Sequence, residues 1–146
     1  MGNAEFVEIL KPFIFTVLIS ALLILIVTAA GMWKIFKKAG YEGWECIVPI
    51  YNAIIFLRII GKPWWWIFLL IVPYVSIIFH IWCANMLSKS FGKNEGFTVG
   101  LFFLYFIFIP ILGFGSAEYE GPYGDPVQFR GYKERNQFDF ERNELV

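Results

Sequence analysis

The sequence predicts an all-α membrane protein with three transmembrane helices, one re-entrant or interfacial amphipathic helix and a polar C-terminal tail. Three observations carry this prediction. The chain has 146 residues and is 58% hydrophobic, which leaves too little polar surface to cover a soluble domain of this size. Its apolar residues gather in long blocks with lysines near their ends, as in segments that cross a bilayer. One block begins with three consecutive tryptophans, and indole rings prefer the boundary between hydrocarbon and lipid headgroups.

The first apolar block covers residues 12–33. About 20 apolar residues suffice to cross a hydrocarbon core about 30 Å thick. Glu5 and Glu8 precede the block, and two acids make a poor n-region for a secretory signal peptide, so we expect a retained span. Three cations follow the block: Lys34, Lys37 and Lys38. Because cationic loops stay in the cytoplasm, the N-terminus is expected outside.

The second block, residues 44–60, is too short and too charged for a clear span. Pro49 interrupts it, Glu45 and Arg58 charge it, and its uncharged part is only about 12 residues long, a length that suits a re-entrant or interfacial helix. Near-membrane cations hardly separate a three-span from a four-span arrangement. Block length and Pro49 favour three spans and a cytoplasmic C-terminus.

Two further blocks, residues 64–87 and 97–114, are the second and third expected spans. Pro63 suits the first position of a helix, whereas Pro73 lies inside the first of these blocks and is expected to kink it. The blocks complete a helical membrane domain of residues 1–117. Residues 118–146 then form a cytoplasmic tail.

Two groups of side chains within the blocks are candidate sites. A membrane-interface anchor consists of Lys62, Trp64, Trp65 and Trp66, and a lipid or quinone headgroup is the alternative role for this cluster. An intramembrane polar stripe consists of Ser76, His80 and Cys83, which fall at positions i, i+4 and i+7 of one helix face. A metal ion needs three or four ligands, so we expect a neutral His80 that bonds a neighbouring helix, and no metal, cofactor or catalytic site.

The tail combines aromatic and basic residues in a pattern typical of a docking peptide. Four aromatic side chains within a dozen residues would otherwise stay in contact with water. The candidate partner-docking residues are Phe129, Arg130, Tyr132, Arg135, Phe138 and Phe140.

An ordered series of short motifs carries a resemblance to a known family. The motifs are Pro49-Ile50-Tyr51-Asn52, the run from Gly61 to Trp66, Lys89-Ser90-Phe91-Gly92-Lys93, the run from Pro110 to Gly115, and Tyr119-Glu120-Gly121-Pro122. Together they resemble an uncharacterised bacterial family of multi-pass membrane proteins that is similar to the N-terminal membrane module of Bacteroidota type I signal peptidases. The resemblance implies a module that ends in the cytoplasm. The Ser-x-Met-x-Pro motif of those peptidases is absent from the 146 residues, so the resemblance does not extend to catalysis.

We therefore expect a non-enzymatic protein of the bacterial inner membrane, an accessory or scaffold subunit of a larger complex that docks through its tail. Two alternatives stay open: a signal-peptidase or Sec-associated accessory protein without its own catalytic dyad, and a small transporter or channel subunit. The near absence of charge within the apolar blocks argues against the hypothesis of a transporter or channel subunit. Expected partners are membrane lipids and other inner-membrane proteins. The net charge of zero argues against nucleic acid as a partner, and no small-molecule substrate is identifiable.

Overall fold

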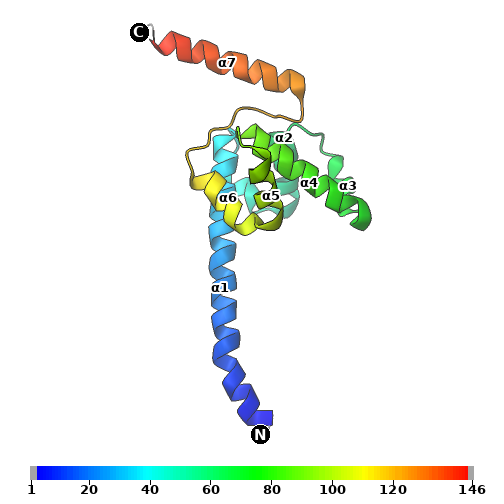
Figure 1. The fold of residues 1–146 in the computed structure, drawn as a ribbon, viewed down its shortest axis with the longest axis vertical. Coiled ribbons are helices and arrows are strands. Elements are labelled where there is room, and N and C mark those ends of the chain that lie inside the picture. Colours follow the sequence, from blue (N-terminus) through cyan, green and yellow to red (C-terminus); the bar gives the residue numbers. More distant parts are fainter. Residues whose placement is uncertain (1–2, 145–146) are drawn as a thin grey trace.

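The computed structural model describes residues 3–144 and contains helices but no strands among them (Figure 1). Helices make up 79% of the structure, so the all-α class is confirmed. In chain order the elements are α1 (Asn3–Lys38), the short 3₁₀ helix η1 (Gly43–Cys46), α2 (Pro49–Ile59), α3 (Trp66–Ile71), α4 (Pro73–Ser90), α5 (Glu95–Phe103), α6 (Tyr105–Phe114) and α7 (Pro126–Glu144).

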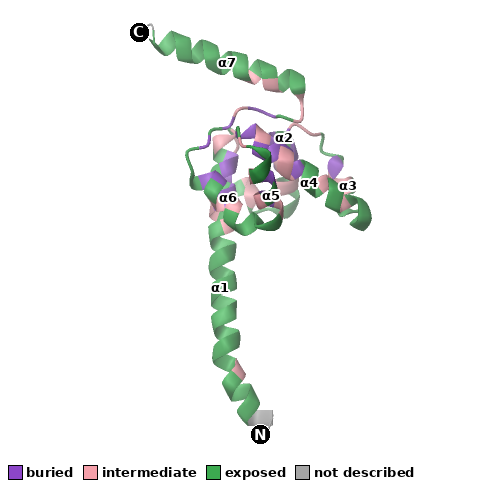
Figure 2. Cartoon of the chain, viewed as in Figure 1, coloured by how far each residue is buried: buried purple, intermediate pink, exposed green. Residues whose placement is uncertain are grey.

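Helix α1 has two parts with different surroundings. Residues 5–27 are exposed almost without interruption, although most of them are apolar (Figure 2). From Gly31 onward the helix is packed, with Ile35 and Phe36 fully buried. Within the described residues, α1 is the one helix long and apolar enough to cross a membrane. The first part of α1 therefore projects as a lone apolar rod from a compact unit (Figure 1).

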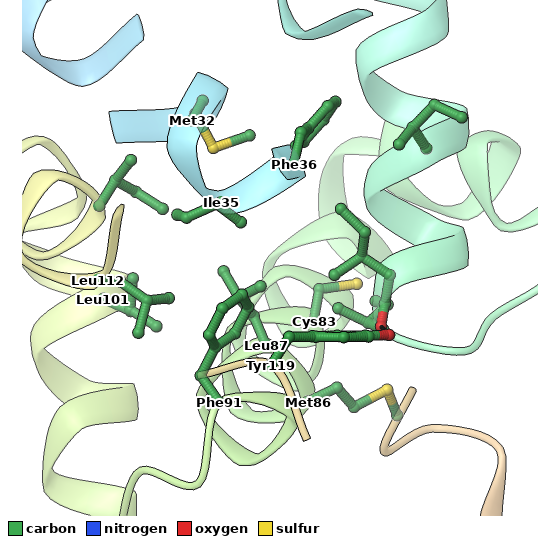
Figure 3. Packing of buried hydrophobic residues seen from close by; sticks show 14 of the residues in the cluster. Met32, Ile35, Phe36, Cys83, Met86, Leu87, Phe91, Leu101, Leu112 and Tyr119 are labelled. Atoms are coloured by element: carbon green, nitrogen blue, oxygen red, sulfur yellow. Dashed lines mark hydrogen bonds between the residues drawn. The ribbon is translucent and has the colours of Figure 1, made fainter. Parts of the chain in front are cut away.

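The compact unit consists of η1 and α2–α6, gathered around the C-terminal end of α1 (Figure 1). Its core joins side chains from α1, α4, α5, α6 and the segment after α6 in one cluster (Figure 3). Leu57, Leu87 and Leu112 are fully buried there. The closest helix crossing joins α1 to α6, because Gly31 and Gly113 let the two backbones touch.

The structure corrects the expected kinked helix over residues 64–87. The chain reverses at Val72, whose extended backbone (ψ 117°) ends α3, and Pro73 starts α4. Trp66 of α3 packs against Phe79 and Trp82 of α4, with ring centroids 5.1 and 5.6 Å apart, so the two helices form an antiparallel hairpin. Proline lacks an N–H and clashes with the preceding turn, which explains why the helix breaks completely here.

A second correction concerns residues 97–114, where the sequence predicts one continuous span. Leu104 (ψ 45°) separates α5 from α6, and Phe97 of α5 lies 5.0 Å from Phe108 of α6 between ring centroids. The ring of Phe108 occupies the space where a side chain on Gly100 would be. This aromatic packing between two antiparallel helices stabilises a reversal that no proline signals.

The expected interfacial helix over residues 44–60 is also divided, into η1 and α2. Gly43 lies against the ring of Trp33, and the Cys46 Sγ is 3.8 Å from the Ala29 carbonyl oxygen. The chain thus runs back along α1 through η1, reverses near Val48 and returns through α2, which Pro49 begins. Three helical hairpins, η1–α2, α3–α4 and α5–α6, therefore build the compact unit.

Packing also continues beyond the expected domain boundary at residue 117. Tyr119, Gly121 and Pro122 are buried, and only α7 lacks buried residues. The tail is helical from Pro126 to Glu144 and crosses the end of the compact unit opposite the free part of α1 (Figure 1).

Candidate functional site

The segment after α6, residues 115–125, crosses the ends of the hairpins, and we call it the strap. The Tyr119 hydroxyl donates to the Ile59 carbonyl oxygen at 2.6 Å, and the Gly124 N–H donates to the Ile60 carbonyl oxygen at 2.7 Å. The Glu120 N–H donates to the Ser90 carbonyl oxygen at 2.8 Å. These bonds satisfy carbonyl groups at the C-terminal ends of α2 and α4, which helix geometry leaves without partners.

Lys38, in the last turn of α1, binds carbonyl groups at the same end of the molecule. Its Nζ donates to the carbonyl oxygens of Leu112, Gly115 and Ala117 at 2.8, 2.7 and 2.8 Å, so one ammonium group caps α6 and holds the start of the strap. Burial lowers the pKa of Lys38, and the positive charges of Lys93 and Lys34 lower it further. The bonds from Lys38 to Ala117 and from Glu120 to Ser90 bring the ends of α1 and α4 to the same end of the molecule.

Two glycines of the sequence motifs are required by the strap. Gly61 has φ +79°, and a Cβ there would lie 2.7 Å from the Asp125 nitrogen. Gly92 has φ +64°, and the Glu120 carboxylate occupies the space beside it. Residues with a side chain rarely adopt such φ values. The motif glycines thus serve the turns on which the strap rests.

The expected interface anchor divides into a packed and an exposed part. The Lys62 Nζ lies 5.0 Å from the Trp66 ring centroid and 5.9 Å from that of Trp82, and it donates to the Gly124 carbonyl oxygen at 2.9 Å. Trp66 is 8% exposed, whereas Trp64 and Trp65 are 61% and 49% exposed. Lys62 and Trp66 therefore join the α3–α4 hairpin to the strap through a cation–π contact, and the other two indoles face outward.

The expected polar stripe lines a cavity of about 650 Å³ between α1, α2, α4, α5 and α6. Ser76, His80 and Cys83 all border it, together with mostly apolar side chains. The His80 Nδ1 donates to the Ser76 carbonyl oxygen at 2.7 Å, and the Ser76 Oγ donates to the Pro73 carbonyl oxygen at 3.0 Å. His80 thus bonds its own helix and not a neighbouring one, because the α-helix offers it a carbonyl one turn away.

The lining of this cavity is mostly apolar, and its polar groups bond the nearby backbone. Asn52 also borders it, and its Nδ2 donates to the Cys46 carbonyl oxygen at 2.9 Å, so the polar groups serve the local backbone. Cys83 is 3% exposed. Among the described residues, no three side chains of the His, Cys, Asp or Glu type gather as metal ligands would.

The expected docking residues of the tail also fall into two sets. Tyr132 packs edge-on against Tyr119 and Phe129 against Tyr123, both with ring centroids 5.4 Å apart. The Lys133 Nζ pairs with the Glu120 carboxylate at 3.0 Å. Phe138 and Phe140 are 69% and 66% exposed. Arg130 and Arg135 are exposed as well. The start of α7 binds the strap, and the second half of the helix is exposed, with Asn136, Gln137 and Phe140 along a groove that it shares with the strap.

Sequence reasoning missed the roles of Lys38, Ser90 and Tyr119. Lys38 lies in a lysine cluster that signals orientation, and Tyr119 lies in a motif that has no local chemistry. Their partners are distant in the chain, 60 residues away for the Tyr119 bond to Ile59. The sequence shows only that these three residues lie in or near short motifs, and this does not identify the residue that each side chain contacts.

Together the fold and the strap define a helical protein with one helix of membrane-spanning length and a compact apolar unit built from three hairpins. Residues 44–122 match a family of unknown function, DUF5684. The match covers more than half of the chain, so this protein belongs to that family. No curated protein and no solved structure matches the chain. The matched residues coincide with the three hairpins and the strap up to Pro122, and both α1 and α7 lie outside them.

Proposed function

We propose that this protein is a non-enzymatic scaffold of the bacterial inner membrane, in which α1 crosses the bilayer and α7 docks a partner protein in the cytoplasm. The 36 residues of α1 extend about 54 Å at 1.5 Å per residue, more than a hydrocarbon core of about 30 Å requires. Their exposed apolar surface needs lipid as its solvent.

The lysines that follow this span favour a cytoplasmic compact unit and an N-terminus outside. The three-span arrangement that the sequence predicts also puts the tail in the cytoplasm, so the docking proposal does not depend on the number of spans.

The docking role rests on the exposure of the second half of α7. None of the 19 residues of α7 is buried. Phe138 is nine positions from Phe129, which is about 180° around a helix, so it lies on the face opposite the strap. A phenylalanine that is 69% exposed on a fixed helix is the kind of anchor residue that interface pockets bind.

Charge favours a protein over a lipid surface as the partner of α7. The helix contains four acids, Glu134, Asp139, Glu141 and Glu144, and four bases, Arg130, Lys133, Arg135 and Arg142. Basic clusters, not neutral ones, attract anionic lipids. We therefore expect the partner to present an apolar pocket with charges of both signs around it, as at the rim of protein interfaces.

Affinity isolation in mild detergent tests the docking role. Wild-type protein is compared with the Phe138→Ala and Phe140→Ala double variant, and co-purifying proteins are identified by mass spectrometry. The matched control is Val127→Ala, which removes an equally exposed apolar side chain (72% exposed) at the other end of α7. The proposal expects a stoichiometric partner that the double variant loses and the control keeps. A wild-type protein that purifies alone contradicts it.

The same experiment distinguishes the general scaffold from a second candidate function. The resemblance to the membrane module of signal peptidases supports an accessory role in signal-peptide processing. A signal peptidase or a translocon subunit as the partner that depends on Phe138 would favour this role, and an unrelated membrane complex would favour the general scaffold.

A further inference from the structure

We infer that the compact unit is embedded in one leaflet of the bilayer, with its three hairpins dipping from the face where α1 ends and their turns near the midplane. The inference rests on the proposed crossing of α1 but not on docking by α7. Its partner is the hydrocarbon of a single leaflet, and α1 alone crosses the membrane.

The hairpin turns are apolar, which is the first observation. Turns of soluble proteins are polar because they face water. Here Ile47 is 66% exposed before α2, Tyr74 is 91% exposed beside the α3–α4 turn, and Phe103 is 73% exposed at the α5–α6 turn. The last two turns lie on the side of the compact unit toward which the free part of α1 extends (Figure 1). The third, η1–α2, reverses after η1 has run back along α1 from Trp33 to Ala29.

Basic charge lies at the opposite end of the hairpins, which is the second observation; the acids within the hairpin helices are Glu45 in η1 and Glu95 at the start of α5. The stretches 46–57, 63–88 and 96–117 contain no Asp, Glu, Lys or Arg, and they coincide with the hairpins. The cations of the compact unit precede or follow these stretches: Lys34, Lys37, Lys38, Arg58, Lys62, Lys89 and Lys93. Such a boundary between a charged end and an uncharged body is what a single water–lipid interface selects.

The strap shows that these cations lie on one side of any membrane. Lys38 of α1 bonds the Ala117 carbonyl oxygen, and three residues later the Glu120 N–H bonds the Ser90 carbonyl oxygen at the end of α4. Gly124 is bonded to both Ile60 and Lys62. A topology with three spans separates Lys89 and Lys93 from Lys38 by a full bilayer, which these contacts forbid.

The lengths of the helices fit one leaflet. Helices α2, α5 and α6 have 11, 9 and 10 residues, or about 14 to 17 Å at 1.5 Å per residue. Half of a hydrocarbon core of about 30 Å is about 15 Å. Helix α4 is longer, with 18 residues, and runs obliquely across the unit (Figure 1).

Each hairpin turn contains a backbone hydrogen bond at the end of a helix. The Ser76 N–H bonds the Val72 carbonyl oxygen at 2.8 Å, and the Asn52 N–H bonds the Val48 carbonyl oxygen at 2.7 Å. At the third turn the Leu104 N–H bonds the Gly100 carbonyl oxygen at 2.7 Å. These bonds lower the penalty that hydrocarbon imposes on unpaired backbone groups at the reversals.

Cysteine labelling in intact cells tests the sidedness. In a Cys46→Ser and Cys83→Ser background, single cysteines replace Val7, Lys62 and Lys93, and an impermeant thiol reagent is applied before and after permeabilisation. We expect Lys62→Cys and Lys93→Cys to label together, from the side opposite Val7→Cys. Labelling of Lys62→Cys and Lys93→Cys from opposite sides overturns the inference. If these two label from outside and Val7→Cys from inside, the inference holds and the proposed cytoplasmic orientation fails.

Depth is measured on the same background in phosphatidylcholine vesicles, with nitroxide labels on Tyr74→Cys and Phe103→Cys. Both positions are exposed, so the label does not disturb the core. We expect both labels near the midplane, where collisions with oxygen exceed those with a water-soluble nickel complex. A label at either headgroup region overturns the inference. A wild-type protein that purifies without a partner in the isolation experiment, with midplane labels retained, would contradict the proposed function alone.

Discussion

Lys37 and Lys38 are neighbours in the sequence but have different surroundings. Lys37 is exposed, whereas the Lys38 ammonium binds three carbonyl oxygens at the end of α6 and the start of the strap. We expect Lys38→Met to lower the free energy of unfolding by roughly 1–3 kcal/mol, because the carbonyl groups lose a charged donor. Thermal unfolding in detergent, followed by circular dichroism, measures the change. Lys37→Met is the matched control, and an equal effect of both substitutions would show that the cap contributes nothing.

Tyr119 gives the protein a dependence on alkaline pH. Burial raises the pKa of its phenol well above the usual value, which is about 10 in unfolded chains. The folded state therefore keeps the proton that the unfolded state releases, so the contribution of Tyr119 to stability is complete below about pH 10 and falls as the pH rises through the folded pKa. The bond to the Ile59 carbonyl oxygen is lost when the phenol ionises.

Tyr119→Phe tests this role without changing the ring. We expect the variant to be less stable than wild type at pH 8 by roughly 1–2 kcal/mol, because the buried Ile59 carbonyl loses its donor. The difference should shrink between pH 8 and pH 11, because the unfolded wild type gains stability by releasing its phenol proton above about pH 10, whereas phenylalanine has no proton to release. Unfolding midpoints of the two proteins across this range provide the measurement. A difference that stays constant with pH would contradict the assignment.

At the scale of elements, the crossing of α1 and α6 depends on two glycines. A Cβ on Gly31 would lie 2.9 Å from the Pro110 Cα, and one on Gly113 would lie 2.8 Å from the Gly31 Cα. Because both neighbours are backbone, they cannot rotate away. We expect Gly31→Ala to separate the helices and to lower the unfolding free energy by roughly 1–3 kcal/mol. Close contact through small residues is a common way for helices to associate in membranes.

A glycine on α7 offers the control for this substitution. Gly131 has no atom within 4 Å of its Cβ position, and alanine favours a helix by about 0.5–1 kcal/mol over glycine. We therefore expect Gly131→Ala to keep or raise the unfolding midpoint in the same circular dichroism measurement. If Gly31→Ala behaved like Gly131→Ala, the close crossing would be absent from the folded protein.

The sequence was sufficient for helical content, because this depends on local chemistry. The expected helix start at Pro63 is wrong, since α3 begins at Trp66. Pro49 and Pro73, expected to interrupt and to kink a block, instead begin α2 and α4. The sequence was insufficient to predict the hairpins. Residues 97–114 form an unbroken apolar run, and the reversal at Leu104 depends on the fit of Phe108 onto Gly100, a contact between helices that hydrophobic periodicity does not encode.

At the scale of the whole molecule, the short motifs that are scattered through the sequence meet at one end. Gly61 and Lys62, Ser90 and Gly92 all contact the strap, and residues 110–115 lead into it. Sequence reasoning found the motifs but assigned the run from Gly61 to Trp66 to membrane anchoring alone. The strap contacts join positions about 30 to 60 residues apart, and pairing over such distances is decided by the packed fold, not by local propensity.

The free part of α1 and the compact unit should behave as independent halves of the molecule. Residues 13–27 are exposed and would meet only lipid in the proposed crossing of the bilayer, so their exact side chains should not matter to the compact unit. We expect replacement of these 15 residues by an alternating leucine and alanine segment of equal length to leave the unfolding free energy of the compact unit within about 0.5 kcal/mol of wild type. Ile35→Ala, at the fully buried end of the same helix, should lower it by about 2–5 kcal/mol. Thermal unfolding in detergent compares the two variants, and a large loss in the replaced protein would mean that the free part of α1 has a packing partner within the folded protein or in a second copy.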